Sequence, residues 1–284
     1  MNFQERLDEC LRQSGSLLCV GLDPQPEQLP AAVRQKRDPV LAFSQAIVEA
    51  TAPWAAAFKP NAAFYEALGP AGLETLRRTI AFIHQRCAAL VIVDAKRADI
   101  GHSSAAYAHA LLDLLGADAI TLNPYLGRDA LAPFLGRPER GCFILCRTSN
   151  PGAGEFQDLP VDGRPLYQVV AERVQRWDEH GNCGLVVGAT YPEELAHVRA
   201  LCPRLPLLIP GVGAQQGDLE RAVRAGVDAR GGRVLVNAAR AILYASAGDD
   251  FAEAAAGVAR ELCTTIHQVV GSALGSPLRP DGGR

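Results

Sequence analysis

Residues 91–106 read VIVDAKRADIGHSSAA, and this stretch contains a complete transition from strand to helix. The β-branched run at 91–93 predicts a buried strand. Asp94, Lys96 and Asp99 follow within six residues, before a polar start to the next helix. Charged groups close to a core cost several kcal/mol unless they are paired. A charge cluster at the end of a buried strand therefore indicates a functional site.

The same pattern recurs along the whole chain. Eight short runs are continuously apolar rather than alternating, and each is followed by a helical or helix-like segment. Such runs are typical of a parallel sheet covered by helices. We expect strands at 17–22, 55–60, 89–94, 117–122, 142–146, 184–187, 205–209 and 234–236.

Eight strand–helix units in about 250 residues favour a closed (β/α)8 TIM barrel, which is a single-domain α/β fold. A doubly wound open sheet is the alternative, but it usually has fewer strands and a glycine-rich first turn. The first turn here is GLDP at 21–24, which lacks the G-x-G-x-x-G pattern. We therefore expect a barrel domain with an N-terminal helix over 1–275 and a disordered tail over 276–284.

The composition excludes several classes of protein. The 284 residues carry a formal net charge of −3 with no basic block, which argues against nucleic acid or a membrane surface as a partner. No run approaches the roughly 18 apolar residues of a transmembrane helix, and the charged N-terminus is unlike a signal peptide. The eight cysteines are scattered without a C-x-x-C motif. This usage predicts reduced thiols in a cytoplasmic protein.

Lysine usage singles out two positions. Of the 28 Lys and Arg residues only three are lysines, namely Lys36, Lys59 and Lys96. Lys59 and Lys96 each close an apolar run, whereas Lys36 lies in a polar segment and is interpreted as a surface charge. A lysine can be tuned to release a proton at useful pH, whereas an arginine cannot.

In a barrel the C-terminal ends of all the strands meet at one mouth, where active sites are built. A single polar residue after a strand is more often a helix cap or a turn residue, so the set carries more weight than its members. The polar residues expected at the mouth are Asp23, Lys59, Asp94, Lys96, Asn123, Thr148, Ser149, Thr190, Gln215 and Arg240.

Asp94 and Lys96 have i, i+2 spacing, so on an extended strand their side chains point the same way. With Lys59 on the neighbouring strand they can form an array of alternating ammonium and carboxylate groups in which a lysine acts as a proton donor. A structural ion-pair network is the alternative interpretation. The six histidines show no pairing at a metal-site spacing, so no metal site is predicted.

Two adjacent loops indicate an anionic ligand. PGVG at 210–213 follows the seventh expected strand, and its glycines allow backbone N–H groups to approach a ligand closely. Ala239 and Arg240 follow the eighth strand. The loops after strands seven and eight of barrels commonly bind phosphate, and arginine suits that role. An ordinary glycine turn and a surface arginine are the alternative.

Taken together, these segments resemble the orotidine 5′-phosphate decarboxylase family, and most of all its longer bacterial branch. DAKRADIG at 94–101 is similar to the D-x-K-x-x-D-I signature of that family. Further similar segments follow in the same order over nearly the whole chain: GLDP at 21–24, FKPN at 58–61, TSNPGA at 148–153, VGAT at 187–190, PGVGAQ at 210–215 and NAARAI at 237–242.

The resemblance implies a homodimeric (β/α)8 enzyme that uses neither metal nor cofactor. Its expected reaction is the conversion of orotidine 5′-phosphate to UMP and carbon dioxide, the last step of de novo pyrimidine synthesis (EC 4.1.1.23). By the same resemblance, Lys96 would protonate C6 of the pyrimidine. Asp94 would lie against the substrate carboxylate, and Lys59 would hold Asp94 and touch the ribose.

The resemblance assigns the substrate-binding residues as well. Asp23 would bind a ribose hydroxyl, and Ser149 would contact the pyrimidine. Gln215 and Arg240 would bind the phosphate. The chain around Pro210 and Ala239 would add to the substrate site, with backbone N–H groups after strand eight.

Three residues are expected to act across the dimer. Asp99, Ile100 and Ser103 would reach into the site of the partner subunit. The family commonly has threonine where Ser103 stands, and serine keeps the hydroxyl. Ala239 and Ala241 flank Arg240, where the shorter branch commonly has glycine and serine.

Two rival functions remain open. One is a metal-dependent sugar-phosphate decarboxylase or aldolase of the same superfamily, which shares D-x-K-x-x-D. The other is a non-catalytic barrel that binds a nucleotide. The presence of Lys59, Asp94, Lys96 and Asp99 together argues against the non-catalytic barrel.

Overall fold

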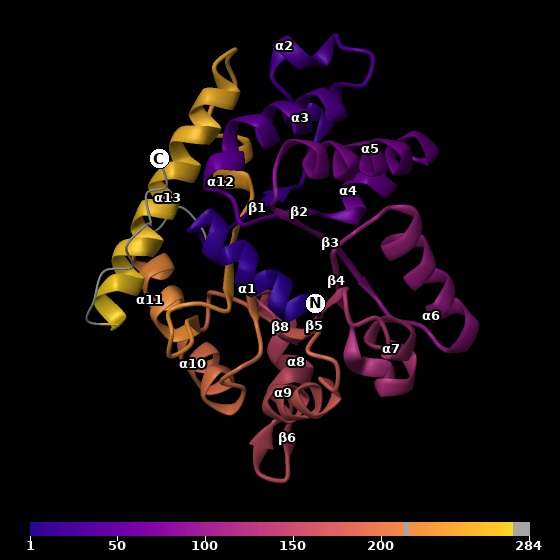
Figure 1. Cartoon of the computed structure of the whole chain (residues 1–284), viewed down its shortest axis with the longest axis vertical. Helices are drawn as coiled ribbons and strands as arrows, with labels where there is room; N and C mark the ends of the chain where they lie inside the picture. The colour runs from indigo at the N-terminus through magenta and orange to yellow at the C-terminus, as the bar shows by residue number, and fades with distance from the viewer. Residues whose placement is uncertain (213–215, 275–284) are drawn as a thin grey trace.

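A computed structural model describes residues 1–212 and 216–274, so the expected tail at 276–284 lies outside the described residues. Parallel strands form a closed barrel in the order β1-β10-β9-β8-β5-β4-β3-β2 (Figure 1). The predicted (β/α)8 barrel is confirmed. Its strands are β1 (Leu18–Leu22), β2 (Ala57–Pro60), β3 (Leu90–Arg97), β4 (Ala119–Leu122), β5 (Gly141–Arg147), β8 (Cys183–Val187), β9 (Leu207–Ile209) and β10 (Val234–Ala238).

Helices surround the barrel and cover the outer face of its strands (Figure 1). The longer ones are α3 (Pro39–Thr51), α5 (Pro70–Arg86), α6 (Gly101–Ala108), α7 (Arg128–Leu135), α9 (Leu166–Trp177), α10 (Pro192–Leu201), α11 (Gln216–Gly226) and α13 (Phe251–Leu274). A π-helical segment over His109–Leu114 continues α6. Short helices are α2 (Ala31–Arg34), α4 (Ala62–Glu66), α8 (Gly154–Gln157) and α12 (Arg240–Leu243).

The strands are continuously apolar because both of their faces are buried. Their outward side chains pack against the helices in one large core. Their inward side chains fill the barrel in a second, smaller core that includes Cys19, Ala57, Ile92, Phe143 and Leu235. A parallel barrel covered on the outside and filled on the inside leaves no polar face on its strands.

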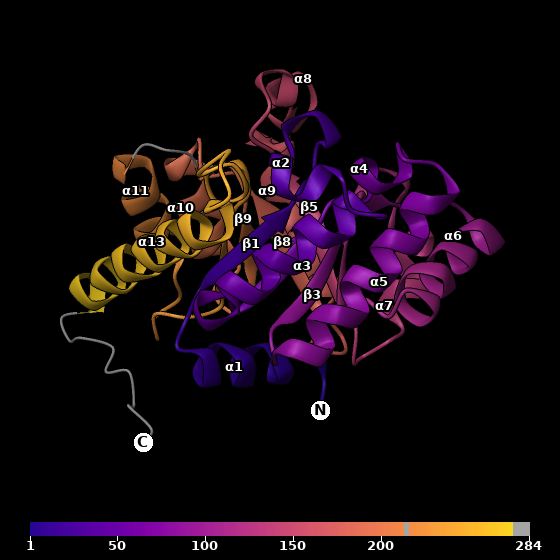
Figure 2. The ribbon, with the colours of Figure 1, turned by 90° about the horizontal axis from the view of Figure 1, so that it is seen from above.

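Helix α1 (Phe3–Ser14) closes the N-terminal end of the barrel (Figure 2). Asn2 and Glu5 form a capping box that begins the helix. Phe3 is fully buried and meets Phe143 edge to face, with ring centroids 5.9 Å apart. A Cβ at position 141 would lie 2.5 Å from the Phe3 ring, so Gly141 leaves the space that this ring fills. Helix α1 with its Phe3 ring is called the plug below. The C-terminal ends of the strands lie at the opposite end of the barrel.

Buried polar contacts fix α1 and the adjoining turns. Asp118, which is 6% exposed, accepts hydrogen bonds from Arg6 (2.7 Å), His84 (2.9 Å) and the backbone N–H of Val91 (2.9 Å). Burial alone would raise the pKa of Asp118, but these donors outweigh it and hold the pKa below its usual value. The contribution of this carboxylate to stability is therefore present at neutral pH and is lost as the pH falls.

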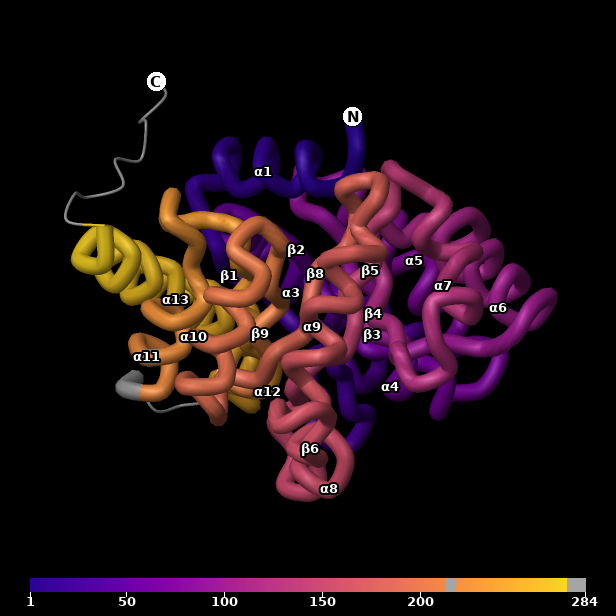
Figure 3. The backbone as a smooth tube through the Cα atoms, turned by 90° about the horizontal axis from the view of Figure 1, so that it is seen from below, coloured from indigo at the N-terminus to yellow at the C-terminus, as the bar shows by residue number. Residues whose placement is uncertain are grey.

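Between β5 and α9 the chain leaves the barrel in an excursion that the sequence predicted only as a loop. It contains α8 and a hairpin of β6 (Pro160–Val161) and β7 (Arg164–Pro165). Figure 3 shows this excursion at the end of the molecule opposite to α1. It therefore projects beside the open mouth.

Candidate active site

Three of the expected mouth residues form a continuous ion-paired array. The ammonium of Lys59, on β2, donates to Asp94 Oδ2 at 2.9 Å. The ammonium of Lys96 donates to Asp94 Oδ1 at 2.6 Å. These two hydrogen bonds bring Lys59, Asp94 and Lys96 together. Lys59 is 3% exposed, whereas the Lys96 side chain is 49% exposed and open to an incoming ligand.

The contacts within the array keep Asp94 and Lys59 charged. Burial alone would raise the pKa of Asp94, but the ammonium groups of Lys59 and Lys96 outweigh it and hold the value well below the usual range. Burial alone would lower the pKa of Lys59, but Asp94 and Asp23 outweigh it and raise the value. A buried carboxylate fixed between two cations is a preorganised electrostatic site.

The path by which Asp94 and Lys96 meet differs from the one that the sequence predicted. The pairing of β3 with β4 is regular at Val93, shifts, and resumes at Arg97. Lys96 lies within this irregular segment in the left-handed region, with φ of 49°. The two side chains therefore come together through a local distortion and not through the alternation of a regular strand.

Thr121, on β4, belongs to the array and was not singled out from the sequence. Its hydroxyl lies 2.8 Å from Asp94 Oδ1 and 2.9 Å from the backbone nitrogen of Lys96. A threonine in an apolar strand looks like an ordinary β-branched core residue. The alternation of side chains along the strand could have identified it. Thr121 lies two residues after Ala119, which faces into the barrel, so Thr121 faces inward as well.

Asp23 lies at the mouth directly after β1 and is partly buried. Burial raises its pKa, and Lys59 only partly opposes this effect. Its Oδ1 atom is buried and has no hydrogen-bond partner among residues 1–212 and 216–274. A buried carboxylate oxygen without a donor is a position at which a ligand hydroxyl can bind.

Ser149 occupies a tight position between two glycines. A Cβ on Gly188 would lie 2.8 Å from Ser149 Cβ and 3.0 Å from its backbone nitrogen. Gly211, at the end of β9, has φ of 88° and approaches the Ser149 hydroxyl. Because Gly188 and Gly211 lack side chains, the backbone of the loop that carries Ser149 can pack close to both of their loops.

Arg147, two residues before this serine, was also not singled out from the sequence. It is 3% exposed, donates to Asp158 at 3.1 Å and lies 4.3 Å from the Tyr191 ring centroid. Gln157 accepts from the backbone N–H of Thr148 at 2.8 Å. These contacts attach the excursion to the end of β5.

The structure describes some of the residues that were expected to bind the phosphate. Arg240 is exposed, begins α12 directly after β10, and has no ion-pair partner in the described part of the chain. Ala239 packs against β1 so closely that a Cβ on Gly21 would lie 2.5 Å from its own Cβ. Pro210 follows β9 and is partly buried. Gln215 and Gly213 lie outside the described residues.

The structure does not bring every expected residue into this array. Asn123 caps a short helical turn by accepting from Tyr125 N at 3.1 Å, and Thr148 binds Asn150 and Gln157 in its own loop. Thr190 is exposed. These side chains are occupied locally or face solvent, as isolated polar residues after strands usually are.

Asp99, Ile100 and Ser103 also stay out of the array of their own chain. Asp99 Oδ1 accepts from the backbone N–H of Ile100 at 2.8 Å. Ile100 is 65% exposed, and Ser103 lies exposed on α6. The exposed side chains of Ile100 and Ser103 are therefore available to something outside this chain.

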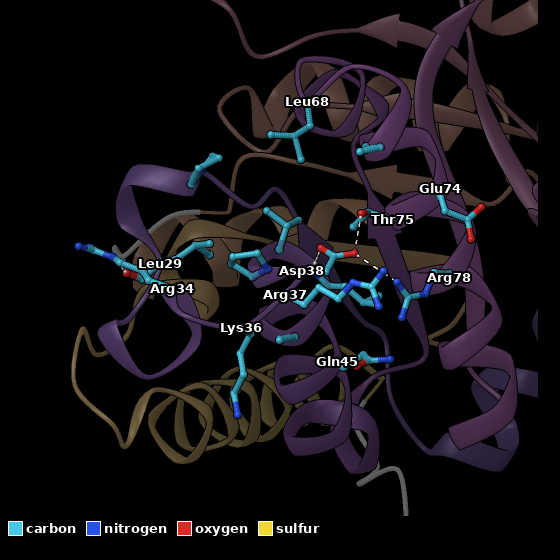
Figure 4. A pocket seen from close by; sticks show the side chains of 17 residues that line it. Leu29, Arg34, Lys36, Arg37, Asp38, Gln45, Leu68, Glu74, Thr75 and Arg78 are labelled. Carbon is cyan, nitrogen blue, oxygen red and sulfur yellow. Dashed lines mark hydrogen bonds and ion pairs between the residues drawn. The ribbon is translucent and has the colours of Figure 1, made fainter.

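None of the residues of the array lines the surface hollow beside α3 and α5. That hollow, of about 960 Å³, lies outside the barrel beside α3 and α5 (Figure 4). Asp38 in its lining accepts from Leu41 N, Thr75 and Arg78, which is a helix-capping arrangement. Among the residues that the structure describes, no group of three or more His, Cys, Asp or Glu is arranged to hold a metal ion.

Comparison with known proteins relates the site to a family. The model of the orotidine 5′-phosphate decarboxylase / HUMPS family matches residues 16–256. Orotidine 5′-phosphate decarboxylase of Thermomicrobium roseum is 51% identical over 95% of this chain and 96% of the relative. The enzyme of that name from Roseiflexus castenholzii is 49% identical over 94% of this chain and 98% of the relative.

A solved structure agrees with these sequences. OMP decarboxylase of Leishmania donovani superposes with a TM-score of 0.82 at 39% identity, covering 95% of this chain and 99% of that one. Within the described residues, no helix has the length and apolar character needed to cross a membrane. The family match and the full-length relatives agree with the D-x-K-x-x-D-I segment and the array built on it, and the chain belongs to the orotidine 5′-phosphate decarboxylase family.

Proposed function

We propose that this enzyme converts orotidine 5′-phosphate to UMP and carbon dioxide, the last step of de novo pyrimidine synthesis. The observation that carries the proposal is the array at the mouth, in which a carboxylate lies between two ammonium groups and one of these ammonium groups is open to a ligand. Relatives that bear this activity in their names align with nearly the whole chain.

Lys96 is the proposed proton donor. Loss of carbon dioxide breaks the bond between C6 and the carboxyl carbon and leaves the electron pair on C6. The Lys96 ammonium then delivers a proton to C6 and becomes a neutral amine. No cofactor delocalises the electron pair in this scheme, so stabilisation has to come from preorganised charges near C6.

Asp94 is proposed to face the substrate carboxylate. Hydrogen bonds from Lys59, Lys96 and Thr121 hold it in one position and keep it ionised. Two carboxylates at close range repel each other in the bound substrate, and the repulsion disappears when carbon dioxide forms. An interaction that is less unfavourable in the transition state than in the ground state accelerates the chemical step.

The remaining proposed contacts bind the two ends of the substrate. Asp23 accepts from a ribose hydroxyl, and Ser149 contacts the pyrimidine. Arg240 binds the phosphate together with Gln215 and the chain near Pro210 and Ala239. The guanidinium of Arg240 is exposed and has no ion-pair partner among residues 1–212 and 216–274, which supports this role. Binding energy from the phosphate, which is remote from C6, can be used to order the charged array.

We further propose a homodimer in which Asp99, Ile100 and Ser103 complete the partner's site. Large apolar side chains are exposed on this side of the chain, including Ile100 (65%) and Tyr107 (38%) near α6 and Tyr125 (80%) after β4. Exposed apolar side chains of this size are typical of protein interfaces.

The eight cysteines form no disulfide, which is consistent with a cytoplasmic enzyme, and we propose that location. Residues 1–275 are the proposed catalytic unit.

A chelation assay separates this function from the metal-dependent rival. The purified enzyme is expected to consume orotidine 5′-phosphate at the same rate with and without EDTA, because the proposed chemistry uses only side chains. Loss of pyrimidine absorbance measures the rate. Inactivation by EDTA would favour a metal-dependent sugar-phosphate enzyme. Nucleotide binding without turnover would indicate a non-catalytic barrel.

Tyr244 offers a test of how Asp23 is held. Its hydroxyl accepts from Gln25 N at 2.8 Å and donates to the carbonyl oxygen of Asp23 at 3.2 Å, while its own N–H binds Arg240 O at 3.1 Å. Tyr244→Phe is expected to lower kcat/KM by up to about 30-fold, because it removes two hydrogen bonds that are worth about 1 kcal/mol each. Steady-state kinetics with orotidine 5′-phosphate measure the effect.

The control for this prediction is a double-mutant cycle with Asp23→Ala. If Tyr244 acts through Asp23, its removal costs little in the Asp23→Ala background. Full additivity of the two losses would contradict the link and leave Tyr244 with a separate structural role.

A further inference from the structure

We propose that Thr121 is a positioning residue of the decarboxylation, and that its hydroxyl fixes both the proton donor Lys96 and the carboxylate Asp94. The inference rests on the proposed function of the array and deepens it. It assigns a role to a β4 side chain that touches no substrate atom in the proposed scheme and acts through its two neighbours.

The direction of each hydrogen bond follows from the chemistry of the groups. The backbone nitrogen of Lys96, 2.9 Å from Thr121 Oγ1, can only donate. The ionised Asp94 Oδ1, at 2.8 Å, can only accept. The hydroxyl therefore accepts from Lys96 and gives its single proton to Asp94. Thr121 is 1% exposed, so water does not compete for either position.

The first consequence concerns the backbone of Lys96. β3 and β4 are paired at Val93–Ile120 and again at Arg97–Leu122, so three residues on β3 lie opposite Thr121 alone. The N–H of Lys96 takes the Thr121 hydroxyl as its acceptor in place of a strand carbonyl. A φ of 49° is unfavourable for a residue with a Cβ and persists only where surrounding contacts hold it. The Thr121 hydroxyl supplies such a contact at the residue that carries the proton.

The second consequence concerns the course of the reaction. Asp94 Oδ1 accepts from both Lys96 Nζ and Thr121 Oγ1, while Oδ2 accepts from Lys59. When Lys96 has given its proton to C6 it is a neutral amine, and its attraction for Asp94 is much reduced. Oδ1 still has the hydroxyl of Thr121 as a donor. Asp94 is therefore held in place until Lys96 is protonated again.

Thr121→Val and Thr121→Ser form a matched pair for the test. Valine keeps the shape of the side chain and removes the hydroxyl, whereas serine keeps the hydroxyl and removes a methyl group. For Thr121→Val we expect kcat to fall about 100-fold, the cost of a misplaced catalytic group, with KM changed less than about threefold. For Thr121→Ser we expect kcat within about threefold of the wild-type value.

A second readout isolates the proton transfer. In the proposed scheme, exchange of the C6 hydrogen of UMP for deuterium in D2O, followed by NMR, depends on Lys96 and involves no loss of carbon dioxide. Thr121→Val is expected to slow this exchange by a factor similar to its effect on kcat. A residue that merely supports the fold would lower the melting temperature without slowing exchange in the folded enzyme. If Thr121→Val does not fold, Thr121→Ala takes its place in both measurements.

The possible results distinguish a failure of this inference from a failure of the proposed function. Wild-type kcat and exchange in Thr121→Val would overturn the inference, and so would equal losses in the valine and serine variants. A wild-type enzyme that does not turn over orotidine 5′-phosphate would instead overturn the proposed function. Slow exchange and low kcat in Thr121→Val, with recovery in Thr121→Ser, are the results that support the role.

Discussion

Lys96→Ala is expected to abolish release of carbon dioxide from orotidine 5′-phosphate while the fold persists. A general acid contributes up to about 10,000-fold to a rate, and here the same group also stabilises the electron pair on C6, so we expect a loss of at least that size. Asp94 keeps Lys59 and Thr121 as donors in this variant, and the barrel core is untouched. Single-turnover assays with excess enzyme measure the residual rate.

The chain provides a matched control for this substitution. Lys36→Ala removes another of the three lysines, at an exposed position outside the array, and should leave kcat unchanged. The Lys96→Ala protein should still bind UMP, because the phosphate and ribose contacts remain. Substantial turnover by Lys96→Ala would assign the proton to a different donor, and loss of UMP binding would point to a collapsed site.

Mixing two inactive variants should restore activity if the site is shared. Lys96→Ala lacks the proton donor, whereas Asp99→Ala lacks the group proposed to enter the partner's site. In a mixed dimer, one site has Lys96 from one chain and Asp99 from the other, so that site is complete. Random exchange makes half of the dimers mixed, and about a quarter of the wild-type activity is expected for such a two-fold symmetric dimer.

The control is a mixture of Lys96→Ala with Lys59→Ala. Both changes affect residues of the same chain's array, so subunit exchange creates no complete site and no activity should return. Recovery is measured after partial denaturation and renaturation of the mixed proteins. Absence of recovery in the Lys96→Ala and Asp99→Ala mixture, once mixed dimers have been detected, would contradict the shared site.

The barrel could be predicted from the sequence because its determinants are local. Each strand is a short, continuously apolar run, and each is followed by a helix, so eight repetitions limit the topology. The same logic placed Lys59 and Asp94 together, since residues at the ends of neighbouring parallel strands converge whatever the details of their loops. These expectations needed only the order of the elements.

The distortion at Lys96 could not be predicted, because it depends on how β3 pairs with β4. No local pattern in the segment VIVDAKR predicts that the pairing of β3 with β4 shifts between Val93 and Arg97. Thr121 was overlooked for the same reason: its role follows from lying opposite that shift. Conversely, Asn123 and Thr148 were expected at the mouth, but their side chains bind nearby atoms in their own turns.

The plug formed by α1 has a consequence for how the enzyme is made. Phe3 and Arg6 leave the ribosome well before their partners Phe143 and Asp118. Asp8 likewise precedes Arg233, with which it pairs at 2.8 Å. During synthesis the helix has no complete surface to bind until most of the chain has emerged. We therefore expect α1, although it is translated before the strands that it covers, to be among the last elements to dock. A nascent barrel then stays open at its N-terminal end until its final strand is in place.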